Sequence, residues 1–290
     1  MIVAVTGGKG GTGKSFVATN LAVLLSRNKS LVAADLDVEA PNDHILLGVD
    51  LENEEPVKIM FPFIDYEKCI KCRACVNVCD TGAMLAARDG TPYVIPRLCS
   101  GCKSCLFVCP TGAIVAGARI IGRTYRTPVH VGGSSFTLVT GVLKEGEEHT
   151  PPVVLAARRR ALSLKSDIYL VDTAAGTSNT VSTAMYKASV AVAVTEPTPL
   201  GLHDLELILR VIDELEIPHR FVVVNRAGIG PDEEHSKIAA RYGAEVVAKI
   251  PYTRDVVESY VKGVPLVVSR PESPASRALR EVSDRILEVI

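Results

Sequence analysis

The sequence predicts an α/β fold, with a mostly parallel sheet flanked by helices and a small cysteine-rich domain inserted into it. Three observations predict this fold. Short apolar segments alternate with helical segments near both ends of the chain, a glycine-rich loop follows the first apolar segment, and all eight cysteines lie between Cys69 and Cys109. Continuous apolar strands are typical of a parallel sheet covered on both faces, and their alternation with helices indicates an open α/β sheet.

The composition is that of a folded protein with balanced charge. The chain has 290 residues, of which 47% are hydrophobic and 22% charged, and its formal net charge is −1. This apolar content excludes a disordered protein, and the charge balance argues against a strongly basic nucleic-acid binder. No apolar run approaches the roughly 18 residues that span a bilayer, and no basic segment precedes an apolar one at the N-terminus. We therefore expect a cytoplasmic protein that binds neither nucleic acid nor membrane.

The C-terminal segment 277–290 is amphipathic, a pattern that also occurs in membrane-binding tails. Glu281, Asp284 and Glu288 offset its arginines, which weakens attraction to anionic lipid. We therefore expect this segment to pack on the body of the protein.

The individual elements follow from apolar spacing. The first fifty residues predict a β-α-β unit, with strands over 2–5 and 31–34 and a helix over 16–25 that carries apolar residues on one face. Further strands are expected over 168–171, 190–194, 221–224 and 246–250, and a helix over 202–215. Ligands of such sheets lie beyond the carboxyl ends of the strands, so we expect the site at that edge.

The segment 61–118 interrupts the pattern and contains an internal repeat. Residues 69–83 and 99–113 are identical at eight of fifteen positions, including all four cysteines of each copy. We therefore predict a discontinuous main domain over 1–60 and 119–290 with a small domain inserted over 61–118. Weak alternation and a Gly-Gly pair within 119–150 indicate a hairpin that returns to the main domain.

Residues 8–15 match the phosphate-binding motif G-x-x-x-x-G-K-[ST], between a predicted strand and a predicted helix. Backbone N–H groups of such a loop point at phosphate oxygens, and the helix adds its positive N-terminal end. The expected nucleotide-binding residues are Gly8, Gly10, Gly11, Thr12, Gly13, Lys14 and Ser15. Lys14 is expected to reach the β- and γ-phosphates and Ser15 to ligate Mg²⁺. A glycine-rich turn without a ligand is the alternative, which the agreement of motif and context disfavours.

With Lys9 included, the loop reads K-G-G-x-G-K-[ST] and resembles that of the MinD/Mrp/ParA family of P-loop ATPases. The resemblance implies a P-loop NTPase fold and Mg-dependent ATP hydrolysis. In that family the extra lysine crosses a dimer interface to the partner's nucleotide. The resemblance therefore implies a homodimer that forms on ATP binding, with Lys9 and Lys14 stabilising charge on the transferring phosphoryl group. A solvated Lys9 that only steers nucleotide is the alternative.

The resemblance extends to the ends of four other strands. It implies that Asp37 orients or activates the attacking water, and that Asp35 and Asp172 hold Mg²⁺ together with Ser15. The positions that read the purine and border the base are then Asn225, Arg226 and Pro251.

Each copy of the cysteine repeat has the spacing C-x₂-C-x₂-C-x₃-C. This is the pattern of bacterial two-cluster ferredoxins, in which the fourth cysteine of each copy ligates the other cluster. The first predicted 4Fe–4S cluster has the ligands Cys69, Cys72, Cys75 and Cys109, and the second has Cys99, Cys102, Cys105 and Cys79. Two alternatives are disfavoured. Disulfides would need an oxidising compartment, and zinc sites usually use two separated C-x-x-C pairs, which the repeated pattern of four cysteines does not match. A purely structural role for the clusters, as staples of a small domain, is a further alternative.

The combined motifs resemble the MinD-superfamily ATPases that carry an inserted ferredoxin domain. The leading hypothesis is that ATP-driven closure of a dimer is coupled to electron transfer to a redox or iron–sulfur partner protein. An iron–sulfur cluster assembly or carrier ATPase is an alternative, although no cysteine follows Cys109. A positioning or regulatory switch, with the inserted domain as redox sensor or partner dock, is the third hypothesis.

Overall fold

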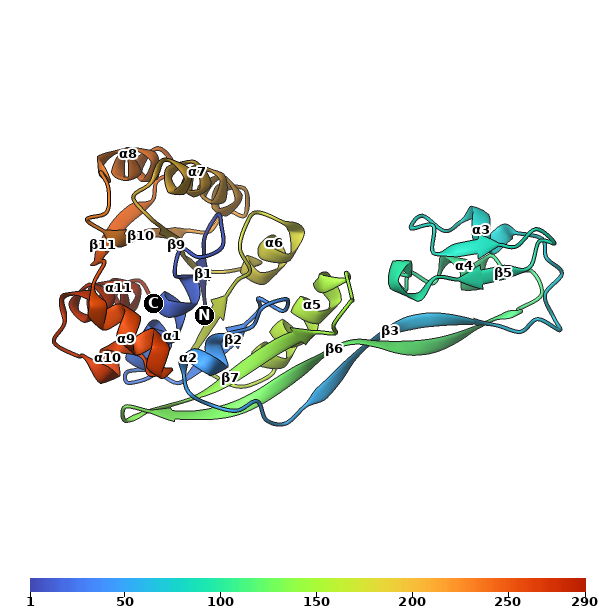
Figure 1. Ribbon diagram of the computed structural model, residues 1–290, viewed down its shortest axis with the longest axis horizontal. Coiled ribbons are helices and arrows are strands. Elements are labelled where there is room, and N and C mark those ends of the chain that lie inside the picture. Colours follow the sequence, from blue (N-terminus) through green and yellow to red (C-terminus); the bar gives the residue numbers. More distant parts are fainter. The chain divides into compact units, whose positions relative to one another are not determined.

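The computed structural model describes residues 1–290 and divides into two compact units. Unit 1 comprises Met1–Glu55, Thr124–Val142 and Val154–Ile290, and unit 2 comprises Pro56–Arg123 and Leu143–Val153. Both chain termini belong to unit 1 (Figure 1). Residues 56–60, 119–123 and 143–153, which were predicted to belong to the main domain, group here with unit 2. The predicted bounds of the inserted domain, 61–118, therefore lie within unit 2. An ion pair between Arg119 and Glu147 joins the last two of these segments within unit 2.

Unit 1 holds most of the strands and helices. Its strands are β1 (Ile2–Thr6), β2 (Leu31–Asp35), β7 (Ser134–Leu143), β8 (Ile168–Asp172), β9 (Val190–Thr195), β10 (His219–Ala227) and β11 (Glu245–Pro251). Its helices are α1 (Lys14–Leu25), α2 (Asp43–Leu46), α5 (Thr150–Leu162), α6 (Asn179–Met185), α7 (Pro199–Glu214), α8 (Glu233–Arg241), α9 (Arg254–Lys262), α10 (Leu266–Ser269) and α11 (Pro274–Glu288). Strand β7 ends and helix α5 begins at the boundary with unit 2.

The main sheet has the strand order β11-β10-β9-β1-β8-β2-β7-β6-β3. In it, β3 (Glu55–Ile64) belongs to unit 2 from Pro56 on, and β6 (Ile114–Val131) belongs to unit 2 up to Arg123 and to unit 1 from Thr124 on. Strand β1 pairs with β8 and β9, and the pairs β2–β8, β2–β7, β9–β10 and β10–β11 are also parallel. These seven strands therefore run in one direction and end at one edge of the sheet. The predicted mostly parallel sheet is thus confirmed.

Both faces of this sheet are covered by helices. Val3 and Val5 of β1 pack in a cluster with α1 and α11, whereas Ala4 between them packs in a second cluster with α6, α7 and α8. Figure 1 shows α7 and α8 on one side of the strands and α1 and α11 on the other. Side chains of a strand alternate between its two faces, so burial on both faces explains the continuous apolar strands.

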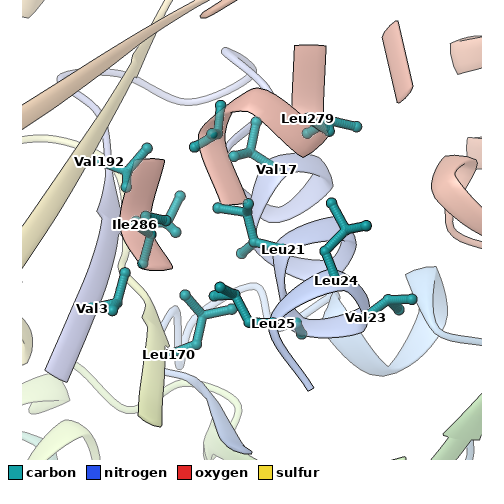
Figure 2. Close-up of a cluster of buried hydrophobic side chains, with 14 of the residues drawn as sticks. Val3, Val17, Leu21, Val23, Leu24, Leu25, Leu170, Val192, Leu279 and Ile286 are labelled. Carbon is teal, nitrogen blue, oxygen red and sulfur yellow. The ribbon is translucent and has the colours of Figure 1, made fainter. Parts of the chain in front are cut away.

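Helix α1 is buried on almost every side. Its side chains Val17, Leu21 and Leu25 lie among residues of β1, β8, β9 and α11 (Figure 2). Leu279 and Ile286 of α11 complete this cluster, and both are fully buried. The C-terminal segment therefore packs on the body of the protein, as predicted.

The predicted element positions agree with the observed ones to within a few residues. Helix α1 begins at Lys14, two residues before the predicted start, because Gly13 precedes it in a left-handed conformation. Strand β10 (His219–Ala227) is longer than the predicted 221–224 because its pairing with β9 begins at His219 and its pairing with β11 extends to Ala227.

The backbone of unit 2 contains an internal repeat that corresponds to the repeat in its sequence. Its elements are β3 (Glu55–Ile64), α3 (Ala74–Asn77), β4 (Met84–Ala86), β5 (Pro92–Val94), a 3₁₀ turn (Pro96–Leu98), α4 (Ser104–Phe107) and the first part of β6 (Ile114–Val131). Residues with positive φ occur in pairs thirty positions apart, at Lys71 and Gly101, Arg73 and Lys103, and Gly82 and Gly112. The two copies of the sequence repeat therefore adopt the same chain path.

Strands β6 and β7 form the hairpin expected within 119–150. Gly132 and Gly133 connect them, with φ values of +56° and +78°. A two-residue turn of type I′ requires positive φ at both positions. Glycine adopts this conformation without strain, which explains the Gly-Gly pair.

Alanine at Gly132 is expected to destabilise the protein more than alanine at Gly133. Both substitutions force alanine into positive φ, which costs about 1 kcal/mol. At Gly132 the new Cβ would also lie 2.5 Å from Val268 Cγ2, whereas at Gly133 it would meet nothing within 4 Å. Because overpacking costs roughly 1–3 kcal/mol, urea unfolding should show a free energy lower by about that amount for Gly132→Ala than for Gly133→Ala. Equal losses would show that the contact with Val268 has no energetic weight.

Candidate functional site

The phosphate-binding loop joins β1 to α1 at the carboxyl edge of the sheet. Gly8 lies against α7, since a Cβ at this position would be 2.3 Å from the Asp204 carbonyl oxygen. Gly11 and Gly13 have φ values of +80° and +94°. A Cβ at Gly10 would meet nothing within 4 Å. The positive φ values therefore explain glycine at Gly11 and Gly13, and the close approach to α7 explains it at Gly8. At Gly10 the loop borders open space.

A cleft of 610 Å³ opens beside this loop. The predicted site residues that line it are Gly10, Gly11, Gly13, Lys14, Ser15, Asp37, Asn225, Arg226 and Pro251. The predicted residues that do not line it are Gly8, Lys9, Thr12, Asp35 and Asp172. Its volume is in the range of ligand pockets.

One wall of the cleft is apolar, and its residues are not among the site residues predicted from the sequence. Tyr252, Val257, Tyr260 and Val261 line it, and their exposed fractions range from 46% to 81%. Three of them lie on α9, where apolar residues recur at positions 256, 257, 260 and 261. That helical spacing is a signal that the sequence contains. A planar base is suited to such a wall because aromatic and aliphatic side chains contact its faces.

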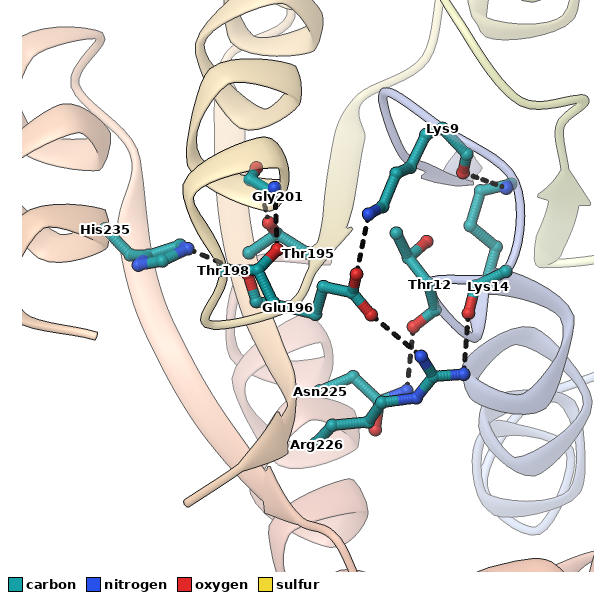
Figure 3. Close-up of polar contacts among 11 residues, drawn as sticks. Lys9, Thr12, Lys14, Thr195, Glu196, Thr198, Gly201, Asn225, Arg226 and His235 are labelled. Carbon is teal, nitrogen blue, oxygen red and sulfur yellow. Dashed lines mark hydrogen bonds and ion pairs between the residues drawn. The ribbon is translucent and has the colours of Figure 1, made fainter. Parts of the chain in front are cut away.

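Two side chains near the C-terminal end of β10 form hydrogen bonds with the phosphate-binding loop (Figure 3). The Asn225 amide donates to the Thr12 carbonyl oxygen at 2.7 Å, and Arg226 donates to the Gly11 carbonyl oxygen at 2.9 Å. Arg226 has a φ of +55°, a conformation that a non-glycine residue adopts only when its contacts hold it. The donors of both side chains therefore bind the loop backbone. Their expected role in reading a purine stays a prediction.

Glu196, at the end of β9, joins two cations of the site. Its carboxylate lies 2.6 Å from Lys9 Nζ and 2.8 Å from an Arg226 nitrogen, and its side chain is only 9% exposed. Figure 3 shows this chain of contacts from Lys9 to Glu196 to Arg226. Lys9 thus has a partner within its own chain. The sequence analysis assigned Glu196 no role, because a carboxylate distant in sequence gives no local signal of this pairing.

Lys14 is directed into the loop. Its ammonium donates to the Lys9 carbonyl oxygen at 3.0 Å. Burial lowers the pKa of Lys14 below its usual value, while the charges of Asp172 and Asp37 oppose this change. A cation buried beside backbone donors is suited to a phosphate.

The acidic residues of the site occupy different environments. Asp37 lines the cleft, and burial raises its pKa although the nearby Lys14 charge acts against the rise. The Asp35 carboxylate accepts backbone N–H bonds from its own loop, from Asp37 at 3.2 Å, Asn42 at 2.9 Å and Asp43 at 3.1 Å. Asp35 therefore fixes the course of the loop that carries Asp37.

The residues present fit a divalent cation. Both carboxylate oxygens of Asp172 are buried without a hydrogen-bond partner. Burial raises its pKa to about 7, against the lowering effect of the neighbouring Ser15 hydroxyl and the Lys14 charge. Hard cations such as Mg²⁺ prefer carboxylate and hydroxyl oxygens, and a buried anion without a donor needs a positive partner.

The eight cysteines of unit 2 gather around two small cavities. The first is lined by Cys69, Cys72, Cys75 and Cys109, and the second by Cys79, Cys99, Cys102 and Cys105. Each cavity therefore takes three cysteines from one copy of the repeat and the fourth from the other. All eight are free thiols.

The fourth cysteine of each copy accepts a backbone hydrogen bond. The Met84 N–H donates to Cys79 Sγ at 3.3 Å, and the Ala113 N–H donates to Cys109 Sγ at 3.2 Å. The Ser104 hydroxyl holds the pKa of Cys102 below its usual value. Thiolates that receive hydrogen bonds are the donor set of iron–sulfur clusters, so the residues present fit two such clusters.

A family model described as the CobQ/CobB/MinD/ParA nucleotide binding domain matches residues 3–266. The chain belongs to this family. It is a nucleotide-binding protein of the MinD/ParA type. The Methanocaldococcus jannaschii protein MJ0579 is 38% identical over 264 residues, which cover 91% of this chain and 90% of that protein. An iron-sulfur cluster carrier protein of Aquifex aeolicus is 26% identical over 137 residues, 43% of this chain and 38% of the carrier.

Solved structures share the fold. The cell division ATPase MinD of Pyrococcus furiosus has a TM-score of 0.60 and 22% identity, with 100% of this chain and 99% of that one covered. The septum site-determining protein MinD of Pyrococcus horikoshii, complexed with Mg-ADP, has a TM-score of 0.58 and 19% identity, with 98% and 95% covered. These similarities show the α/β P-loop fold. None of the helices combines the length and the apolar character needed to cross a membrane.

Gly13→Ala is expected to abolish ADP binding, and Asn225→Ala in the same chain to restore part of it. The new Cβ would lie 2.2 Å from Asn225 Nδ2, and the second substitution removes this collision but not the positive φ. Asn225→Ala alone loses the bond to Thr12, which costs about 0.5–1.5 kcal/mol or roughly 2–13-fold in affinity.

Isothermal titration calorimetry with ADP measures these affinities. Asn28→Ala, which changes an exposed asparagine near the end of α1, serves as the control and should bind like the wild type. A double variant that binds no better than Gly13→Ala would show that backbone strain outweighs the collision.

Proposed function

We propose that this protein is a Mg-dependent ATPase with two 4Fe–4S clusters, in which ATP binding by a homodimer controls electron transfer from the clusters to a redox partner. The observation that carries the proposal is the coexistence in one chain of the phosphate-binding loop with its cleft and of two cavities that each collect four cysteines. The proposed localisation is cytoplasmic.

The nucleotide half of the proposal uses the loop and the apolar wall. The loop N–H groups and Lys14 bind the phosphates, and α9 borders the base. Ser15, Asp35 and Asp172 are the residues that would hold Mg²⁺, which when bound neutralises charge on the phosphates. Asp37 lines the cleft and orients the attacking water. The family membership and the MinD structure complexed with Mg-ADP support this half.

The cluster half rests on the chemistry of unit 2. Its small buried core includes Cys75 and Cys105 beside Met84 and Ile114. So few apolar residues contribute little stability, and small domains with such a core are commonly reinforced by disulfides or metals. The thiols are free, which leaves metal ligation as their stabilising role. A 4Fe–4S cluster, when bound, would accept one electron at a time from a low-potential donor protein and pass it to an acceptor protein.

Lys9 connects nucleotide binding to dimer formation in this proposal. In one chain it pairs with Glu196, and in the ATP-bound dimer it reaches the nucleotide of the partner. Release of Lys9 from Glu196 therefore accompanies closure. Coupling to the clusters requires that ATP bind one of the two states more tightly.

Cluster assembly or delivery is a second candidate, favoured by the relative named as an iron-sulfur cluster carrier protein. That relative matches only 43% of this chain, and no cysteine lies outside Cys69–Cys109. A carrier must give up its cluster, whereas four thiolates around each cavity favour retention. A MinD-like regulatory switch with unit 2 as redox sensor or partner dock is the third candidate, and a partner-binding surface that forms only in the dimer, with no electron acceptor needed, would favour it.

Cys102→Ser should lose one cluster and retain ATP binding, whereas Lys14→Ala should lose ATP binding and retain both clusters. Each cluster contains four irons, so iron content should fall from about eight to about four per chain in Cys102→Ser. Anaerobic iron analysis and ATP titration measure the two properties. Arg97→Ala, which changes an exposed residue that lines neither cysteine cavity, is the control and should keep its full iron content. Full iron content in Cys102→Ser would contradict the ligand assignment.

The rate of ATP hydrolysis should differ between the oxidised protein and the dithionite-reduced protein. If ATP-driven closure of the dimer is coupled to the clusters, the redox state of the clusters must in turn change the affinity for ATP. The measurement is the anaerobic hydrolysis rate and ATP affinity of cluster-loaded protein in both redox states. Equal values with both sites filled would contradict the coupling and leave ATP hydrolysis and cluster binding as independent activities.

A further inference from the structure

Asp43 is a buried carboxylate that belongs to no motif of the sequence analysis. It lies on the short helix α2, it is 3% exposed, and its Oδ1 has no hydrogen-bond partner. One carboxylate oxygen each of Asp35, Asp43 and Asp172 lie within 4.8 Å of one another. Asp43 therefore adds a third carboxylate to the two that the family resemblance implies for Mg²⁺.

The charges around Asp43 are negative. The strongest charge effects on it come from Asp35, Asp172 and Asp37, all of which are acidic. The charge of Lys14 interacts with Asp172 and Asp37. Like charges at this separation repel strongly in a buried environment. The arrangement therefore needs a positive ligand in order to be stable with its carboxylates ionised.

The geometry suits a single ion. Because no edge of the triangle exceeds 4.8 Å, one point lies within about 2.8 Å of all three oxygens. At most a small movement of the side chains brings the oxygens to the roughly 2.1–2.6 Å of Mg²⁺ or Ca²⁺ contacts. Asp43 and Asp172 both have unpartnered carboxylate oxygens, both residues are at least nine-tenths buried, and each contributes an oxygen to this triangle. Asp35 is held in place by its three backbone donors.

We propose that Asp43, with Asp35 and Asp172, forms a divalent-cation site that is filled before the nucleotide binds. The identity of the cation as Mg²⁺ rests on the proposed function, but the site does not require nucleotide. Because Asp35 and Asp43 border the segment that carries Asp37, and the Asp43 N–H donates to Asp35, a cation at this site stabilises the course of that segment. The enzyme would then present an ordered Asp37 to the incoming nucleotide.

The test is a titration of the nucleotide-free full-length protein with Mn²⁺, followed by electron paramagnetic resonance of free Mn²⁺. We expect one tight site in the wild type and an affinity at least about tenfold lower in Asp43→Asn, within the range for loss of a metal-site partner. Asp50→Asn, which changes an exposed aspartate shortly after α2, is the matched control and should bind like the wild type. Wild-type affinity in Asp43→Asn would overturn the proposal.

Unfolding in urea provides a second readout and shows whether the variant folds. In EDTA, Asp43→Asn should be at least as stable as the wild type, because it removes one of three mutually repelling carboxylates. In Mg²⁺ without nucleotide, the wild type should become more stable and the variant should not. A wild type that binds Mg-ADP but neither Mn²⁺ nor Mg²⁺ alone overturns only this inference. A wild type that binds the cation but no Mg-nucleotide contradicts the proposed function and leaves the site standing.

Discussion

The burial of α1 is the constraint on which the nucleotide site depends. Every residue of this helix except Ser15 is buried, and residues such as Leu21 lie between the sheet and α11. A helix packed on all sides cannot rotate or slide without opening cavities, and truncation of one such leucine costs about 2–5 kcal/mol. The first turn of α1 therefore holds Lys14 and Ser15 at a fixed place relative to the strand ends. The bonds from Asn225 and Arg226 to Thr12 and Gly11 extend this support to the loop itself.

Two subsites of opposite charge preference lie side by side at this end of the sheet. The loop N–H groups and Lys14 favour an anion, whereas the buried carboxylates of Asp35, Asp43 and Asp172 favour a cation. Lys14 links the two because its charge acts on Asp172. A Mg-nucleotide matches this arrangement because its phosphates and its metal carry the two complementary charges. Neither an anion nor a cation alone satisfies both subsites.

The sequence predicted the parts of the molecule that local patterns determine. Apolar runs located the strands of unit 1, the motif located the phosphate-binding loop, and cysteine spacing predicted the grouping into which the two cavities fall. Contacts between distant segments were beyond its reach. Glu196 carries no motif, yet it pairs with Lys9 across 187 positions of sequence, and Asp43 becomes part of an acidic cluster only through the fold. The apolar wall on α9 had a helical spacing, but that pattern usually indicates core, and only the structure shows it exposed beside a cleft.

The pairing of Glu196 with two cations bears on how easily the proposed dimer closes. Hydrogen bonds between charged groups contribute about 1.5–3 kcal/mol each, so a Lys9 with no other partner would be released at a cost of roughly 10- to 150-fold in the closing equilibrium. Removing one member of a buried pair is usually worse still, because it leaves an uncompensated charge. Here Arg226 stays within 2.8 Å of Glu196, so the carboxylate keeps a partner when Lys9 leaves. In the proposed dimer Lys9, with a side chain 25% exposed, would exchange Glu196 for water or the partner's phosphate. The second cation therefore lowers the cost of releasing Lys9 in the proposed closure.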